Sequence, residues 1–94
     1  MLTTNQYFDG QVVSIAYQGE HLPTTVGVME TGSYTFDTSQ HETMSIIDGE
    51  VKVRFANHTE FTGFSSGSQF QVAANSQFAI DVLRPTAYLC TYRS

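Results

Sequence analysis

The stretch from residue 34 to residue 49, YTFDTSQHETMSIIDG, holds a carboxylate, Glu42, in a spacing that suggests chemistry. Phe36 and Thr38 precede it at alternate positions, so on a β-strand they share one face, and Gly49 follows it after six residues. This is the spacing of a metal-binding motif, but a phenyl ring donates nothing to a metal ion and one carboxylate does not make a site. A buried carboxyl group can instead exchange a proton with a substrate, because burial raises its pKa.

The other metal-ligating and nucleophilic side chains form no second candidate site. His21, His41 and His58 lie in or beside expected loops and share no strand face or spacing. Cys90 is the one cysteine, and because no base is evident near it we expect a buried core residue, not a nucleophile. The sequence therefore predicts neither a metal nor another cofactor.

The charge of the chain limits its partners. The formal net charge is −5, and the four basic residues are Lys52, Arg54, Arg84 and Arg93. A nucleic-acid surface needs clustered positive charge, so no nucleic-acid polymer is expected to bind. Lys52 and Arg54 share the strand face opposite two valines and are expected to point to solvent, whereas Arg84 and Arg93 stand at strand ends, where either could reach the mouth of a barrel.

The elements that must position these residues are strands. No helical periodicity is present, and short runs with period-two alternation are separated by turn residues. Asp48-Gly49 predicts a hairpin turn between two of these runs, and Arg84-Pro85 is expected to end another. Many short strands indicate an all-β sandwich or barrel. The expected strands cover 11–17, 25–30, 33–38, 42–47, 51–55, 60–64, a run through Phe70 and Val72, 77–83 and 86–92.

Length and composition favour one compact domain, residues 1–94. The chain is 40% hydrophobic and 13% aromatic, which suits a single packed core. No segment approaches the ~20 apolar residues of a membrane span. A single cysteine and a start without an export sequence favour the reducing cytoplasm.

Glu42 and its neighbours resemble the first sequence motif of the cupins, a family of small β-barrels. That motif reads glycine, five residues, His-x-His, three or four residues, Glu, six residues, glycine. Glu42 and Gly49 match its second half, and its two histidine positions fall on Phe36 and Thr38. The leading glycine departs from the pattern, because Gly32 lies three residues before Phe36 instead of five.

A second segment, which starts at Gly67, aligns with the other cupin motif and places its histidine position on Phe78. The resemblance implies a cupin-like β-barrel of the jelly-roll type. It also implies that Phe36 and Phe78, at former ligand positions, face the barrel interior.

Segments from one end of the chain to the other carry a closer resemblance, and the ending Tyr-Leu-Cys-x-Tyr is the most specific of them. On these segments the chain resembles the small pyrimidine/purine nucleoside phosphorylase family. The segments are 5–10, 26–29, 32–36, 42–44 with Gly49, Gly67 with Phe70 and Val72, 76–78 and 85–92.

The resemblance implies an enzyme, a pentosyltransferase that needs no metal. Members of the family cleave purine and pyrimidine nucleosides with inorganic phosphate, the co-substrate, and release a free base and a pentose 1-phosphate. The site must then hold phosphate, stabilise positive charge on the sugar and receive the departing base.

Each candidate residue has a functional and a structural interpretation. Tyr34, Phe36 and Phe78 are expected to stack against the base, since every base has a π-face, or simply to pack in the core. Glu42 is expected to bind sugar hydroxyls, stabilise an oxocarbenium-like centre or exchange a proton with the base; the alternative is a rim carboxylate that fixes a loop.

The position of phosphate stays open among two groups of candidates. Arg84 or Arg93 would supply a charge, whereas backbone amides and the hydroxyls of Thr38, Ser76 and Tyr88 would cradle the anion without one.

Two other functions stay open, together with the oligomeric state. One is a non-enzymatic, metal-free cupin that binds a small metabolite. The other is a metal cupin with atypical ligands. A homodimer is compatible with the resemblance, because such sheets often pair their edge strands.

Overall fold

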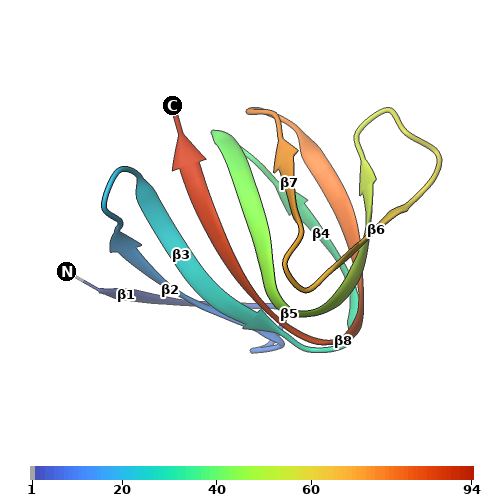
Figure 1. The fold of residues 1–94 in the computed structure, drawn as a ribbon, viewed down its shortest axis with the longest axis horizontal. Coiled ribbons are helices and arrows are strands. Elements are labelled where there is room, and N and C mark those ends of the chain that lie inside the picture. Colours follow the sequence, from blue (N-terminus) through green and yellow to red (C-terminus); the bar gives the residue numbers. More distant parts are fainter. Residues whose placement is uncertain (1) are drawn as a thin grey trace.

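The computed structural model describes residues 2–94 and is built of antiparallel strands (Figure 1). This confirms the all-β prediction. No helix among these residues is long and apolar enough to cross a membrane. The strands are β1 (Thr3–Tyr7), β2 (Val12–Gln18), β3 (Pro23–Met29), β4 (Gly32–Asp37), β5 (His41–Phe55), β6 (Thr62–Ser65), β7 (Gln69–Val72) and β8 (Gln77–Arg93).

Two long strands, β5 and β8, organise the molecule. They pair with each other along most of their length and bend together, so each runs through both halves of a folded sheet (Figure 1). One end of β8 pairs with β3, which continues to β2 and β1, and its other end pairs with β4. The result is a cupin-like jelly roll. Over residues 2–94 the strand order runs from β1 to β6 without joining those two edges, so the barrel is open on one side.

The predicted hairpin at Asp48-Gly49 is wrong, as is the predicted strand end at Arg84-Pro85. Both dipeptides lie inside long strands, where the register of β5 and β8 shifts. Gly49 has φ of 136°, and a Cβ there would lie 2.2 Å from Oγ1 of Thr86. The glycine therefore permits a bulge at the bend, and the bulge tolerates the missing N–H of Pro85.

The remaining expected strands are present, with their ends displaced by one or two residues. Strand β1 was not predicted, because TTNQY has no alternation of apolar and polar residues. This strand is placed by its pairing with β2, from Thr3–Ala16 to Tyr7–Val12. Inward residues of several strands form one buried core cluster, which includes Val12, Met29, Ile46, Val51, Val53 and Ile80.

Candidate active site

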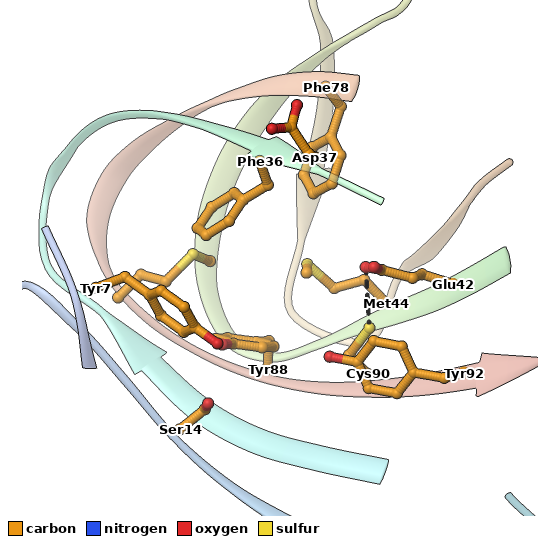
Figure 2. A pocket seen from close by; sticks show the side chains of 11 residues that line it. Tyr7, Ser14, Phe36, Asp37, Glu42, Met44, Phe78, Tyr88, Cys90 and Tyr92 are labelled. Atoms are coloured by element: carbon orange, nitrogen blue, oxygen red, sulfur yellow. Dashed lines mark hydrogen bonds between the residues drawn. The ribbon is translucent and has the colours of Figure 1, made fainter. Parts of the chain in front are cut away.

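A cavity of about 240 Å³ lies inside the folded sheet and receives side chains from six strands (Figure 2). Strand β8 lines it at both ends, because the strand bends around it. The lining residues are Tyr7, Ser14, Met29, Phe36, Asp37, Glu42, Met44, Phe78, Tyr88, Cys90 and Tyr92.

One side of the cavity is an aromatic wall made of Tyr7, Phe36 and Phe78. Phe36 on β4 and Phe78 on β8 are register partners, and their rings stack at 5.7 Å between centroids with 29° between planes. Tyr7, at the end of β1, meets Phe36 edge-on at 6.4 Å. Phe78 is fully buried, Phe36 is half-buried and Tyr7 is 46% exposed. The wall therefore runs from the core to the surface and offers flat apolar faces.

The opposite side is a protic wall made of Ser14, Tyr88, Cys90 and Tyr92 (Figure 2). Tyr88, Cys90 and Tyr92 alternate along β8 and so share one strand face. Burial raises the pKa of the Tyr88 hydroxyl and of the Cys90 thiol to about 12 each, and it also raises the pKa of Tyr92. All three groups keep their protons at neutral pH and act as neutral hydrogen-bond donors. The Tyr92 hydroxyl is itself held by the Thr25 hydroxyl at 3.1 Å.

Glu42 on β5 lies next to the protic wall, and its carboxyl group lines the cavity. The Cys90 thiol donates a hydrogen bond to Oε1 of Glu42 at 3.5 Å (Figure 2). Burial raises the pKa of Glu42, and the Cys90 hydrogen bond and the charge of His41 offset part of that shift. Of the two positions expected for Glu42, the structure has the inward one, and the carboxyl group holds a proton to higher pH than an exposed glutamate.

The structure brings four of the predicted site residues together: Phe36, Glu42, Phe78 and Tyr88. Two of them, Phe36 and Phe78, occupy histidine positions of the cupin motifs. Over residues 2–94, no three His, Cys, Asp or Glu side chains form a group that could hold a metal ion.

Tyr34 and Thr38 were also predicted to bind substrate, but neither lines the cavity. The Tyr34 hydroxyl donates to the carbonyl oxygen of Glu30 at 2.8 Å. The Thr38 hydroxyl donates to the carbonyl oxygen of Ala73 at 2.7 Å and accepts from the Ser76 amide at 2.9 Å. Both hydroxyls therefore fix neighbouring segments.

Arg84, predicted to bind substrate and one of the two arginines considered for phosphate, lies at the bulge of β8 and outside the cavity, where it forms an exposed ion pair with Glu50. Arg93 is exposed and is the register partner of His41. Lys52 and Arg54 are exposed, as expected from their strand face. None of the four basic side chains lines the cavity.

Several residues that line the cavity were not predicted from the sequence. Some of them could have been predicted from strand alternation, and others could not. Cys90 and Tyr92 follow from Tyr88 by period two, once Tyr88 is taken to face inward. Tyr7 and Ser14 required the pairing of β1 with β2, for which the sequence carries no pattern. Asp37 lies at the end of β4, where the alternation of inward and outward residues along a strand no longer determines which way a side chain points.

Comparisons with known proteins agree from one end of the chain to the other. Residues 2–92 match the family model described as pyrimidine/purine nucleoside phosphorylase. A protein of that name from Pseudomonas paraeruginosa is 50% identical over 93 residues, which covers 99% of this chain and 100% of the relative. The crystal structure of a Vibrio parahaemolyticus protein of unknown function is similar with a TM-score of 0.95 and 38% identity, and covers 99% of both chains.

A more distant structure supports the fold alone. An RmlC-like cupin from Shewanella frigidimarina has a TM-score of 0.74 and 12% identity, and the similarity covers 93% of this chain and 79% of the cupin. The cupin-like jelly roll expected from the two sequence motifs is confirmed.

Proposed function

The chain belongs to the pyrimidine/purine nucleoside phosphorylase family, and from this premise we propose that it cleaves purine and pyrimidine nucleosides with inorganic phosphate. The products are a free base and a pentose 1-phosphate, so the enzyme is a pentosyltransferase. One observation carries the proposal: the family match over residues 2–92 includes every residue that lines the cavity. The cavity residues therefore all lie within the part of the chain that matches the family.

The aromatic wall supports a broad choice of base. Stacking on Phe36 and Phe78 uses the π-face that every base offers and reads no hydrogen-bonding edge. The cavity, at about 240 Å³, is smaller than the roughly 300–1,000 Å³ of pockets that enclose a drug-sized ligand. A nucleoside would therefore lie partly at the opening, against the half-exposed ring of Tyr7.

The protic wall and Glu42 support the proton transfer that the reaction needs. In phosphorolysis the bond from the sugar C1′ to the base breaks, a bond from C1′ to a phosphate oxygen forms, and the base leaves with the electron pair. Protonated Glu42 gives the departing base its proton, while Tyr88 and Tyr92 donate hydrogen bonds to developing negative charge. Cys90 orients the carboxyl group by its hydrogen bond to Oε1.

The direct test is base release from uridine and from inosine, with and without phosphate, in the presence of a chelator. We expect release that depends on phosphate and continues with the chelator, because no step uses a metal or another cofactor. No phosphate-dependent release from either nucleoside would refute the proposed activity. Stoichiometric metal in untagged protein would instead favour a metal cupin with atypical ligands.

A non-enzymatic role as a metabolite-binding module is the second candidate. The observation that favours it is that none of the four basic residues lines the cavity, so no side-chain cation is in place for phosphate. Thermal stabilisation by nucleosides without any turnover would support this role over the phosphorylase.

We also propose a homodimer formed through the outer face of β2 and β3. Val13, Ile15, Val26 and Val28 are 38–52% exposed there, and their register partners on β1 and β8 are uncharged. In a chain of net charge −5, this face lets two copies meet without bringing carboxylates together. Sedimentation should give twice the monomer mass for the protein and a monomer for Val28→Lys; a monomeric unmodified chain would refute the dimer.

The cytoplasm is the proposed location. The one cysteine, Cys90, is buried and has no disulfide partner, which suits a reducing compartment. Fractionation of cells that express the tagged chain would test this.

A further inference from the structure

The charges around the cavity are unusual for a site that must hold phosphate. Two carboxyl groups, Asp37 and Glu42, line it. The four basic residues of the chain all lie elsewhere: Arg84 is paired with Glu50, and the other three are exposed outside the cavity. The remaining polar lining groups are neutral hydroxyls and a thiol.

A phosphate dianion is poorly matched to such a site. Each additional negative charge close to Asp37 and Glu42 is repelled, and no lysine or arginine lines the cavity to offset the repulsion. An ionised carboxylate only accepts hydrogen bonds, and so does sulfate, so the two can touch only if a further proton lies between them. The phosphate dianion keeps one P–OH donor, but its second negative charge is repelled by both carboxyl groups.

We propose that the cavity binds inorganic phosphate together with one proton that phosphate shares with Glu42, and that it therefore takes the dihydrogen form in preference to the dianion and rejects sulfate. This inference rests on the proposed phosphorylase activity for its choice of oxyanion. Dihydrogen phosphate beside a carboxylate and the dianion beside a carboxylic acid contain the same number of protons, so both descriptions give the same complex. Sulfate carries no proton at neutral pH, so it would bind only to the protein in which Glu42 itself is protonated, which phosphate does not require.

The groups that face Glu42 from the neighbouring strands fit this arrangement. Cys90 donates to Oε1 of Glu42 at 3.5 Å, which leaves Oε2 for phosphate. Tyr92 of β8 lies across from Glu42 in the register and keeps its proton. Val72 faces it from β7 and is apolar. Asp37 at the end of β4 adds negative charge.

His41 is the neighbouring group that could bring positive charge. Its ring is hydrogen bonded to the amide of Gln71 at 3.1 Å and lies outside the cavity lining. Its charge lowers the pKa of Glu42 without cancelling the rise that burial causes. His41 therefore does not remove the tendency of Glu42 to hold a proton.

The proton balance of the reaction agrees with this complex. Dihydrogen phosphate and a nucleoside give a pentose 1-phosphate monoanion and a neutral base. The attacking phosphate oxygen bonds to C1′ and loses its proton, and the base that leaves with the C1′–N electron pair gains one. The proton shared by phosphate and Glu42 is the one the base collects, and no other reagent is needed.

The kinetic test measures the KM for phosphate with saturating uridine between roughly pH 6 and pH 8.5, with sulfate as a competitor. Above the second ionisation of phosphate, the KM for total phosphate should rise about tenfold per pH unit, because the dihydrogen form declines by that factor. Sulfate should not inhibit. A KM that stays flat over this range, or sulfate that competes as well as phosphate binds, would overturn the inference.

Glu42→Gln separates the role of the carboxyl group from that of the rest of the cavity. Its amide can donate to a dianion, so the pH dependence of phosphate binding should weaken and sulfate should bind. The matched control is Glu60→Gln, an exposed residue outside the cavity, which should behave as the unmodified protein does. A Glu42→Gln protein that still excludes sulfate would contradict the assignment to Glu42.

A binding measurement keeps this inference distinct from the proposed activity. Calorimetry of phosphate binding at about pH 8, in two buffers of different ionisation heat and with uracil present, should show uptake of about one proton per phosphate. Proton uptake without turnover would refute the proposed phosphorylase activity and support the proposed phosphate site. Turnover without proton uptake would refute only the shared-proton complex of phosphate and Glu42. The absence of phosphate binding would refute that complex as well.

Discussion

One long strand, β8, contributes to both walls of the cavity, and the two walls differ in kind. Strand β8 places Phe78 in the aromatic wall before its bend, and Tyr88, Cys90 and Tyr92 in the protic wall after it. The aromatic wall provides apolar ring faces, whose contacts depend little on the orientation of a ligand. The protic wall provides hydrogen-bond donors, which act in fixed directions, beside a carboxyl group. Under the proposed function, binding of the base and transfer of the proton fall to different residues, which can be changed independently.

The difference between the two walls also explains the metal-motif spacing around Glu42. Phe36 and Phe78 stand at positions where the cupin motifs carry histidine, and they form the stacked pair of the aromatic wall. Glu42 keeps its place in the motif and lies next to the protic wall. The frame is kept, and two of the three histidine positions carry phenyl rings that line the cavity.

The largest expected effect is on catalysis when the acid is removed. Glu42→Gln should lower kcat by about 10²- to 10⁴-fold, the usual contribution of a positioned general acid, and leave the nucleoside KM nearly unchanged. Steady-state kinetics with uridine measures both quantities. Glu60→Gln is the matched control, and a Glu42→Gln protein with the kcat of that control would contradict the proposed role.

The next effect is on substrate binding when the aromatic wall is interrupted. Phe36→Ala should raise the nucleoside KM by about 5- to 150-fold, because base stacking contributes about 1–3 kcal/mol. Phe61→Ala removes a 42% exposed ring that lies over Arg54 and serves as the control. Equal KM values in these two variants would exclude Phe36 as a stacking platform.

The sequence predicted these walls unevenly, and the reason is physical. Period-two alternation and the motif register place Phe36, Glu42, Phe78 and Tyr88 inward, and all four line the cavity. The same rule could not show that β5 and β8 continue through Gly49 and Pro85, because a bulge and a hairpin turn use the same residues. Nor could it show that Arg84 would pair with Glu50, because that contact joins positions far apart in the chain.

A smaller effect should follow from displacing the protic wall. A Cβ at Gly27 would lie 2.7 Å from the ring and hydroxyl of Tyr88, so Gly27→Ala should shift Tyr88 and cost about 1–3 kcal/mol of stability. We expect kcat to fall severalfold in the protein that remains folded. Gly63→Ala is the control, because its Cβ would meet only the Val51 carbonyl oxygen, at 4.0 Å. Equal thermal stability of the two variants would contradict the close packing of Tyr88 on Gly27.

The smallest effect concerns stability and pH. Because burial raises the pKa of Glu42, the folded protein binds this proton more tightly than the unfolded chain does. The contribution of Glu42 to stability is therefore lost as the pH rises from the ordinary carboxyl pKa through the raised one. Glu42→Gln should have a higher Tm than the unmodified protein at about pH 7, and the difference should vanish near pH 4. A lower Tm at neutral pH would show that ionised Glu42 stabilises the fold.

The division between the walls is tested most directly by measuring kcat and the nucleoside KM of the unmodified protein, Glu42→Gln and Phe36→Ala in parallel. We expect each variant to change a different parameter. Glu42→Gln should lower kcat with little change in KM, and Phe36→Ala should raise KM with a smaller change in kcat. Variants that change the same parameter to the same extent would contradict the division between the walls.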